Sequence, residues 1–445
     1  MQAKFPLSGQ IAYACGMMGW SILTNTIGVL LVFFYLPPSN SGLVNLLSQV
    51  LIFGTLNLAA VITGAGRLVD AFYDPFIGQT SDRSNNVSGR RIPFMKWSII
   101  PAVVFCALVF FPMEESASTS NAVWLMIILV LFFVSATTYI IPYNAMLPEM
   151  AHSSEDKVRL STFQQVGFVL GIVVSSAANN IADMVQHHLE LEGRTTALQI
   201  SICLLCAFGG LVMAVPVFAI DEKRYCSGKP SHMAILPAMK HSFQNRNFIY
   251  YLFADFSWYM ALYIITSGLL YFLTVLCGGQ ESEGFFLMIT MVITSLLFYP
   301  VVNILANRIG KKKIVLFSFA LMSCVFLFVY YLGKMPFLPP GTQMYLLAIL
   351  AAFPLAALGI LPSAILAEIA EKDSKETGQN REGLYFAVKY FFVKLGQTFG
   401  IGLFAFLTLY GKDPGNDLGL RLNGICGFVL CIAAMLVFSR FKEKK

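Results

Sequence analysis

Long apolar runs alternate with short polar segments along nearly the whole chain. A helix that crosses the hydrocarbon core of a membrane needs about 20 mostly apolar residues, and the runs reach this length repeatedly. We therefore predict twelve membrane-spanning helices. Their expected bounds are 11–36, 43–77, 94–112, 121–147, 160–183, 197–220, 248–276, 284–307, 314–332, 344–369, 383–410 and 419–439.

The composition favours an all-α membrane protein. Hydrophobic residues make up 57% of the chain, charged residues only 12%, and the mean hydropathy is +0.70, outside the range of soluble domains. A membrane-embedded enzyme would need a nucleophile–base pair or a metal-binding cluster within the spans. The sequence places neither there, and all five histidines fall in predicted loops. We therefore expect no enzyme activity, no cofactor, and no metal beyond a coupling cation.

Lysine and arginine are concentrated on the side of the predicted topology that holds both termini. Because cytoplasmic loops carry the excess of basic residues, we expect cytoplasmic termini. The first apolar run has no small-residue cleavage site, so we expect it to stay in an inner (plasma) membrane rather than to be removed as a leader. The net charge of +6 reflects this bias and gives no reason to expect nucleic-acid binding.

Two sequence patterns recur about half a chain apart. Glu149 follows an Ala-Met-Leu-Pro run, and Glu368 follows a similar Ala-Ile-Leu-Ala run; a basic loop after the second span has a counterpart after the eighth. Such spacing indicates duplication of a six-helix unit, an architecture common among secondary transporters. We expect an N-terminal half at 1–220, a cytoplasmic linker at 221–247 and a C-terminal half at 248–445.

The second predicted span contains Arg67, Asp70 and Asp74. The two aspartates are four residues apart and share one face of a helix. An aspartate near the bilayer centre costs about 2.5–3.5 kcal/mol, so a retained pair indicates a use, and paired carboxylates suit a small cation or a proton. The alternative is a salt bridge between Arg67 and Asp70 that only holds helices together. Thr137 on the fourth span offers one more oxygen for a cation.

Charged residues in two other predicted spans bear on the function. Lys394, in the eleventh, is expected to face a carboxylate because an intramembrane lysine usually does. Lys389 lies about 140° around the same helix, and we expect it to snorkel or to pair elsewhere. Asp255, in the seventh span, is either a second protonatable site or a helix-end cap, and the cap is favoured.

Charged residues also gather at the predicted cytoplasmic ends of the helices. Asp82 and Glu149 lie near several arginines in the sequence, so we expect ion pairs that latch this side when the carrier faces outward. The alternative is that the positive charges only set the topology. The residues of this expected cytoplasmic gate are Asp82, Arg83, Arg90, Arg91, Glu149, Arg159, Glu368 and Arg381.

These motifs resemble a known family. The basic loop at 78–91 resembles that of the major facilitator superfamily. The run Asp70-Ala-x-x-Asp74-Pro-x-x-Gly78 looks like the melibiose-permease-like glycoside–pentoside–hexuronide:cation symporters. The resemblance implies the major facilitator fold with two six-helix halves, a cation held by Asp70 and Asp74, and Lys394 across the cavity. Coupling to Na⁺ or to H⁺ stays open. Further segments that fit are Ile141–Met150, Ala367–Ala370 and Phe392–Gln397.

The chain departs from the family where a sugar is expected to bind. Where the family's reference carrier has charged, amide or tryptophan side chains, this sequence has Ser21, Tyr73, Ile140, Asn144, Gln164 and Gly359. A site that lacks these partners rejects the reference sugar. We therefore expect a moderately polar cavity for another small glycoside or neutral polar solute.

The alternative substrate is an amphiphile such as a lysophospholipid, which one member of the family carries. Lysolipids but not free sugars would then displace a bound probe. In either case we expect a monomeric carrier in the lipid bilayer that works by alternating access. The expected substrate-binding residues, whose aromatic members are alternatively packing residues, are Ser21, Asn25, Tyr139, Tyr143, Asn144, Gln164, Gln165, Trp258, Tyr259 and Tyr263.

Overall fold

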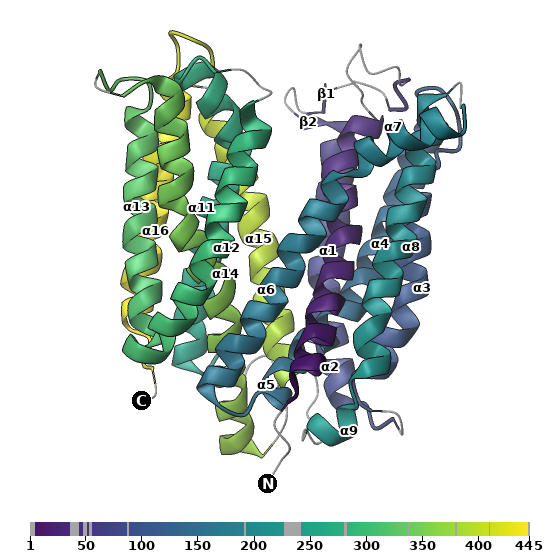
Figure 1. Cartoon of the computed structure of the whole chain (residues 1–445), viewed down its shortest axis with the longest axis vertical. Helices are drawn as coiled ribbons and strands as arrows, with labels where there is room; N and C mark the ends of the chain where they lie inside the picture. Colours follow the sequence, from purple (N-terminus) through teal and green to yellow (C-terminus); the bar gives the residue numbers. More distant parts are fainter. Residues whose placement is uncertain are drawn as a thin grey trace. The chain divides into compact units, whose positions relative to one another are not determined.

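The computed structural model describes residues 5–35, 44–47, 51–52, 56–86, 89–190, 193–226, 242–279, 283–336, 338–378, 381–408 and 410–443. Most of these residues are helical (Figure 1). The helices are α1 (Leu7–Tyr35), α2 (Leu58–Arg83), α3 (Ile92–Leu108), α4 (Thr119–Ala145), α5 (Leu147–Met150), α6 (Ser154–Ser176), α7 (Ala178–His188), α8 (Arg194–Ala219), α9 (Glu222–Tyr225), α11 (Arg246–Tyr271), α12 (Glu283–Ile309), α13 (Lys311–Tyr331), α14 (Pro340–Thr377), α15 (Glu382–Thr408) and α16 (Leu418–Ser439), with a π-helical turn, η1, at Phe272–Leu276.

Nine helical segments in the described ranges are long and apolar enough to cross a membrane, judged by length and composition. The shorter α3 is also apolar. The prediction of an all-α membrane protein is confirmed. The count of twelve spans stays a prediction.

The span predicted at 43–77 is wrong at its start. Leu51–Ile52 forms β1, which pairs antiparallel with β2 at Leu56–Asn57, and the helix begins only at Leu58. The segment before α2 is apolar enough to pass for the beginning of a span. An apolar run alone does not distinguish a helix from a short strand.

Local polar residues set several helix ends. Ser118 accepts a hydrogen bond from the Asn121 amide at 3.1 Å and caps α4. Asn245 accepts from the first amides of α11 in the same way. Gly310, with φ of +90°, separates α12 from α13 because an L side chain rarely adopts that conformation. These short-range signals explain why the long apolar runs divide where they do.

The chain forms two compact units. Unit 1 comprises Met1–His152, Phe163–Ile235 and Ala370–Ala387, and unit 2 comprises Ser153–Thr162, Leu236–Ile369 and Val388–Lys445. Helices α6, α14 and α15 therefore contribute residues to both units. The expected half boundaries at 220 and 248 remain predictions.

Within each unit, the long helices pack closely through small residues. In unit 1, α1 and α3 pack against α8, and α4 packs against α2 and α3 (Figure 1). Gly19 of α1 lies so near Gly209 of α8 that a Cβ would collide with its carbonyl oxygen. In unit 2, α16 packs against α11 and α13, and a Cβ at Gly424 would lie 2.8 Å from the Phe326 carbonyl oxygen. Small residues permit this approach of helices in a membrane protein.

Candidate functional site

A fully buried aspartate lies on α2, the helix that packs against α4. The side chain before it, Tyr73, places its hydroxyl 3.2 Å from Thr138 Oγ1 of α4. Thr138 itself donates a hydrogen bond to the Val134 carbonyl at 2.7 Å. The contact joins α2 to α4 one residue away from Asp74 and from Thr137, and Thr137 is also buried. Two of the expected cation ligands are therefore buried at positions next to this contact between α2 and α4.

The other residues of the expected cation site are described in less detail. Arg67 and Asp70 lie on α2, but their side chains are outside the described residues. Asp70 and Asp74 belong to one continuous helix, as their spacing predicts. Lys394 is half-buried on the part of α15 that belongs to unit 2.

Several predicted substrate residues of unit 1 are buried and hydrogen-bonded within the protein. Gln164 Nε2 donates to Asn144 Oδ1, and Asn144 Nδ2 donates to the Ile140 carbonyl at 2.7 Å. Ser21 Oγ donates to the Phe168 carbonyl at 2.7 Å and so joins α1 to α6. These polar groups already have protein partners, so a substrate would have to compete for them.

Two predicted substrate tyrosines help to hold α1, α4 and α8 together. Tyr143 donates to the Tyr13 carbonyl at 2.6 Å, Tyr13 donates to the Tyr143 carbonyl at 3.2 Å, and their rings stack with centroids 4.2 Å apart. Tyr139 donates to the Met213 carbonyl of α8 at 2.8 Å. A Cβ at Gly16 of α1 would lie 2.8 Å from both the Tyr139 and Tyr143 side chains. In this structure the tyrosines act as packing residues.

The remaining predicted substrate residues are divided between the units. Asn25 and Gln165 are half-buried in unit 1. In unit 2, Trp258 is buried, whereas Tyr259 and Tyr263 are half-buried on α11 and pack against glycines of α15. The last three therefore share one helix, as the sequence predicts.

Five buried charged residues of unit 1 form a network, which we call the unit 1 charge cluster: Asp82, Arg90, Arg91, Glu149 and Glu382. Arg91 Nη2 lies 2.6 Å from Glu149 Oε1 and 3.2 Å from Glu382 Oε2, and its Nη1 lies 3.0 Å from Asp82 Oδ1. Arg90 Nη2 lies 2.7 Å from the same Glu149 oxygen. The cluster joins α2, the loop before α3, α5 and α15.

The pKa of Arg91 shows how the cluster is balanced. Burial lowers this pKa, but the carboxylates of Glu149, Asp82 and Glu382 outweigh burial, so the pKa is raised above the ordinary arginine value. Arg91 therefore stays protonated. Its planar guanidinium can serve several carboxylates at once, which a lysine ammonium does less well.

Asp82 also caps the start of α15. Its Oδ1 accepts a hydrogen bond from the Gly383 amide and its Oδ2 from the Leu384 amide, both at 3.0 Å. A carboxylate is stabilised at a helix N-terminus because the first amides there lack partners. The two helices approach closely at glycines: a Cβ at Gly78 would lie 2.7 Å from the Gly383 oxygen and 2.8 Å from Ala387 Cβ.

A second carboxylate, from Glu222 of α9, caps α3. It accepts hydrogen bonds from the backbone amides of Arg90, Arg91 and Ile92 at 2.7 to 3.1 Å. Gly89 precedes these amides with φ of +118°, and a Cβ there would collide with the Glu222 carboxylate. The segment after α8 is thereby joined to the start of α3.

The same arrangement recurs in unit 2, about half a chain later. Glu443, which follows α16, accepts hydrogen bonds from the amides of Lys311 and Lys312 at 2.7 and 3.1 Å. Gly310 precedes them with φ of +90°, and a Cβ there would lie 2.8 Å from the Glu443 carboxylate. The inferred duplication therefore extends to a distant carboxylate that caps a helix beside a positive-φ glycine.

The other predicted gate residues are not members of the unit 1 charge cluster. Glu368 Oε1 pairs with Lys311 Nζ in unit 2 at 2.6 Å. Arg381 is buried and pairs with Asp373 at 2.8 Å. The final two are exposed: Arg83 and Arg159.

Sequence reasoning missed five residues of these networks, namely Glu222, Glu382, Glu443, Lys311 and Asp373. A weak signal was present, because Glu222 follows a predicted span and Glu382 adjoins a predicted gate arginine. The partners of Glu222, Glu382 and Lys311 are far away along the chain, however, and local spacing carries no information on them, whereas Arg381 is only eight residues from Asp373.

The sequence matches the family described as MFS/sugar transport protein over residues 12–412. The isoprimeverose transporter of Lactiplantibacillus pentosus is 24% identical over 97% of this chain and 88% of that protein. Sodium-dependent lysophosphatidylcholine symporter 1 of Mus musculus is 20% identical over 78% of this chain and 69% of that protein.

Among solved structures, the major facilitator superfamily transporter FucP in the outward conformation has a TM-score of 0.66 at 13% identity, covering 98% of this chain and 99% of that one. At this identity the likeness shows the fold alone, and it confirms the predicted fold class. Because the family match covers most of the sequence and the fold agrees, the chain belongs to the melibiose-permease-like MFS/sugar transport protein family of multi-pass membrane transporters, and it is not an enzyme.

Proposed function

We propose that the chain is a cation-coupled symporter of a small polar organic solute, sugar-like or glycoside-like, that works by alternating access. The observation that carries the proposal is Asp74, a fully buried carboxylate on α2. A buried charge is costly in a membrane and is kept where it has a use. The match to the MFS/sugar transport protein family supports the solute class, and a relative named as a sodium-dependent lysophosphatidylcholine symporter supports cation coupling.

In the proposed mechanism, Asp70 and Asp74 bind Na⁺ or H⁺, and the Thr137 hydroxyl completes the site when the ion is Na⁺. Lys394 neutralises one of the two aspartates when the ion is absent, and Arg67 balances the charge of the other aspartate. Ion binding drives the conformational change only if the two states differ in affinity for the ion. The polar residues of the expected substrate site then bind the solute from the side of the membrane from which the ion entered.

The unit 1 charge cluster is the proposed cytoplasmic gate. Its buried ion pairs join α2, α5 and the first turn of α15, so they must break if these elements separate. Breaking such pairs is costly, which makes the closed state distinct from the open one. We propose a monomer in the inner (plasma) membrane, with both termini cytoplasmic.

The test is solute uptake into proteoliposomes that contain the purified protein. A panel of labelled glycosides is offered with an inward Na⁺ gradient, an inward H⁺ gradient, or neither. We expect one solute to accumulate above equilibrium under one gradient, and Asp74→Asn to abolish accumulation while the protein stays folded. The matched control is Asp183→Asn, which removes an exposed aspartate and leaves accumulation intact. Gradient-driven accumulation by Asp74→Asn at the normal level would overturn the assignment.

Thermal unfolding in NaCl, with KCl as the control for ionic strength, separates the two ions. Ligand binding to the folded state raises the melting temperature by mass action. A sodium-specific rise that Asp74→Asn removes would identify Na⁺. The absence of a rise, together with uptake under an H⁺ gradient, would identify H⁺.

The second candidate is transport of a lysophospholipid. The observation that favours it is that Asn144 and Gln164, at positions expected to hold a sugar, are buried and bonded to each other. The similarity to the mouse lysophosphatidylcholine symporter supports the same substrate class. Displacement of a bound fluorescent lysolipid by unlabelled lysolipid, and not by the glycoside panel, would favour this candidate.

A further inference from the structure

A second intramembrane aspartate lies outside the proposed cation site. Asp255 is on α11 in unit 2 and is only 5% exposed. The sequence favours a helix-end cap for this residue, and that expectation is wrong. Asn245 caps α11, and Asp255 lies more than two turns further along. Its Oδ2 atom is buried and has no hydrogen-bond partner in the described part of the chain.

A lysine on the neighbouring helix provides the opposite charge. Lys389 of α15 is 3% exposed, so it does not snorkel to the surface, and its charge acts on Asp255. The structure records no direct ion pair between them among the described residues. The helices nevertheless approach closely, because a Cβ at Gly396 of α15 would lie 2.9 Å from the Phe256 carbonyl oxygen of α11. The two buried charges thus balance each other without direct contact.

The other titratable groups that face Asp255 are phenols. They are Tyr251 and Tyr259 on α11, and Tyr390 of α15 lies near these two phenols. The Tyr251 hydroxyl is itself buried without a hydrogen-bond partner in the described residues. Tyr251 and Asp255 are four residues apart and therefore share one face of α11.

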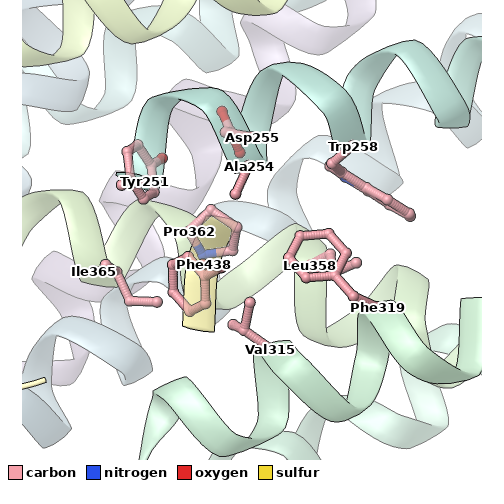
Figure 2. Close-up of a pocket in the computed structure, with 10 residues that line it drawn as sticks. All are labelled: Tyr251, Ala254, Asp255, Trp258, Val315, Phe319, Leu358, Pro362, Ile365 and Phe438. Atoms are coloured by element: carbon pink, nitrogen blue, oxygen red, sulfur yellow. The ribbon is translucent and has the colours of Figure 1, made fainter. Parts of the chain in front are cut away.

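Both residues line a small pocket whose other walls are mostly apolar. Figure 2 shows Tyr251, Ala254, Asp255 and Trp258 along α11, with Phe438 and residues of α13 and α14 on the opposite side. The cavity volume is about 10 Å³. That space holds about one water molecule and no organic solute.

The side chains that line this pocket determine which ligand it can bind. A buried carboxylate with an unpaired oxygen is costly, and a bound proton removes its charge. A metal cation such as Na⁺ prefers several oxygens, whereas the pocket offers one carboxylate and one phenol with an ammonium group nearby. We propose that Asp255 is a proton-binding site, balanced by Lys389 across the α11–α15 interface and separate from the aspartates of α2.

The proton adds to a carboxylate oxygen of Asp255 and forms a carboxylic acid, while Lys389 keeps its proton. The pair then changes from neutral to a net charge of +1, and the attraction between α11 and α15 is lost. Proton occupancy therefore acts on the packing of these two helices. The site is independent of which solute is carried and of which ion binds at Asp74.

Infrared difference spectroscopy tests the site without any transport assay. The protein is labelled with ¹³C-aspartate, reconstituted in lipid, and titrated from about pH 3 to about pH 11, a range that brackets the ordinary pKa values of aspartate and lysine. We expect a carbonyl band of a protonated, isotope-shifted aspartic acid that disappears on titration. Asp255→Asn loses this band, whereas Asp74→Asn and the exposed control Asp183→Asn keep it.

Two further variants test the proposal if Asp255→Asn does not fold. In Asp255→Glu, the carbonyl band must shift when the protein is labelled with ¹³C-glutamate, and it must not shift with ¹³C-aspartate. In Lys389→Met, it must persist to more alkaline pH, because the carboxylate has lost its counter-charge. The proposal is overturned if the titration of the wild type and Asp255→Asn is the same, or if the band in Asp255→Glu keeps the aspartate label. Neither result bears on solute uptake, so the proposed function is tested separately.

Discussion

At the residue scale, Arg91 shows how a charge is kept inside this protein. Its side chain is fully buried and contacts Asp82, Glu149 and Glu382. Each carboxylate would be expensive to bury alone, and the shared guanidinium offsets that cost only while its fork geometry is kept. The identity of the side chain, beyond its charge, therefore matters at this position.

We expect Arg91→Lys to lower the stability of the detergent-solubilised protein by about 1–3 kcal/mol, because a single ammonium leaves buried acceptors unsatisfied. The matched control is Arg194→Lys, whose arginine pairs with an Asp183 side chain that is 58% exposed. Exposed pairs contribute little, so the control should change stability by less than about 1 kcal/mol. Thermal unfolding of both variants measures the difference. Equal melting temperatures would show that the geometry around Arg91 is unimportant.

At the scale of elements, glycines decide which helices come into backbone contact. Gly78 of α2 lies against the first turn of α15, where Asp82 caps the helix. Close approach and capping support each other, since the Asp82 carboxylate reaches the α15 amides only if the two helices are near. Elsewhere on α15, Gly402 has nothing within 4 Å of an added Cβ.

The two glycines should therefore respond in opposite ways to alanine. Gly402→Ala is expected to be neutral or to stabilise α15 by about 0.5–1 kcal/mol, because alanine loses less backbone entropy. Gly78→Ala is expected to destabilise by about 1–3 kcal/mol, because the methyl group forces α2 away from Gly383 and Ala387. Melting temperatures that change in the same direction for both would contradict this account of the contact.

At the scale of the whole molecule, one structural device is used twice. Glu222 caps α3 beside Gly89, and Glu443 caps α13 beside Gly310. In both cases a carboxylate that follows one long helix satisfies the free amides at the start of another. Connections of this kind hold the ends of the helices together where the chain leaves the apolar region.

Alanine at each positive-φ glycine tests the repeated device. Gly415 is the control, with φ of +85° and nothing within 4 Å of an added Cβ. Gly415→Ala should cost about 1–2 kcal/mol through backbone conformation alone. Gly89→Ala and Gly310→Ala should each cost more, because the methyl group also displaces the capping glutamate. Thermal unfolding of the three variants checks this order. A Gly415→Ala variant that is as unstable as the other two would show that the capping glutamates do not contribute to stability.

The amino-acid sequence alone determined the class of the protein, the approximate positions of most long helices and the placement of two aspartates on one helix. Each of these depends on local physics: the length of an apolar run, the cost of a charge in hydrocarbon, and the spacing of residues on a helix. The sequence pattern around Glu149 was also seen to recur around Glu368, because duplication leaves a pattern in the sequence. The short strands before α2 were missed since an apolar run does not distinguish a strand from a helix.

Only the tertiary structure decided the partners of the charged residues. Asp82 meets amides about 300 residues away on α15, and Glu222 and Glu443 cap helices that begin about 130 residues earlier. The tertiary structure also brings the opposite charges of Asp255 and Lys389 near each other, because their helices lie side by side in unit 2. A polar group on one helix gives no local signal of the atom that will satisfy it. Burial makes an unpaired polar group costly, and packing alone determines which partner is near.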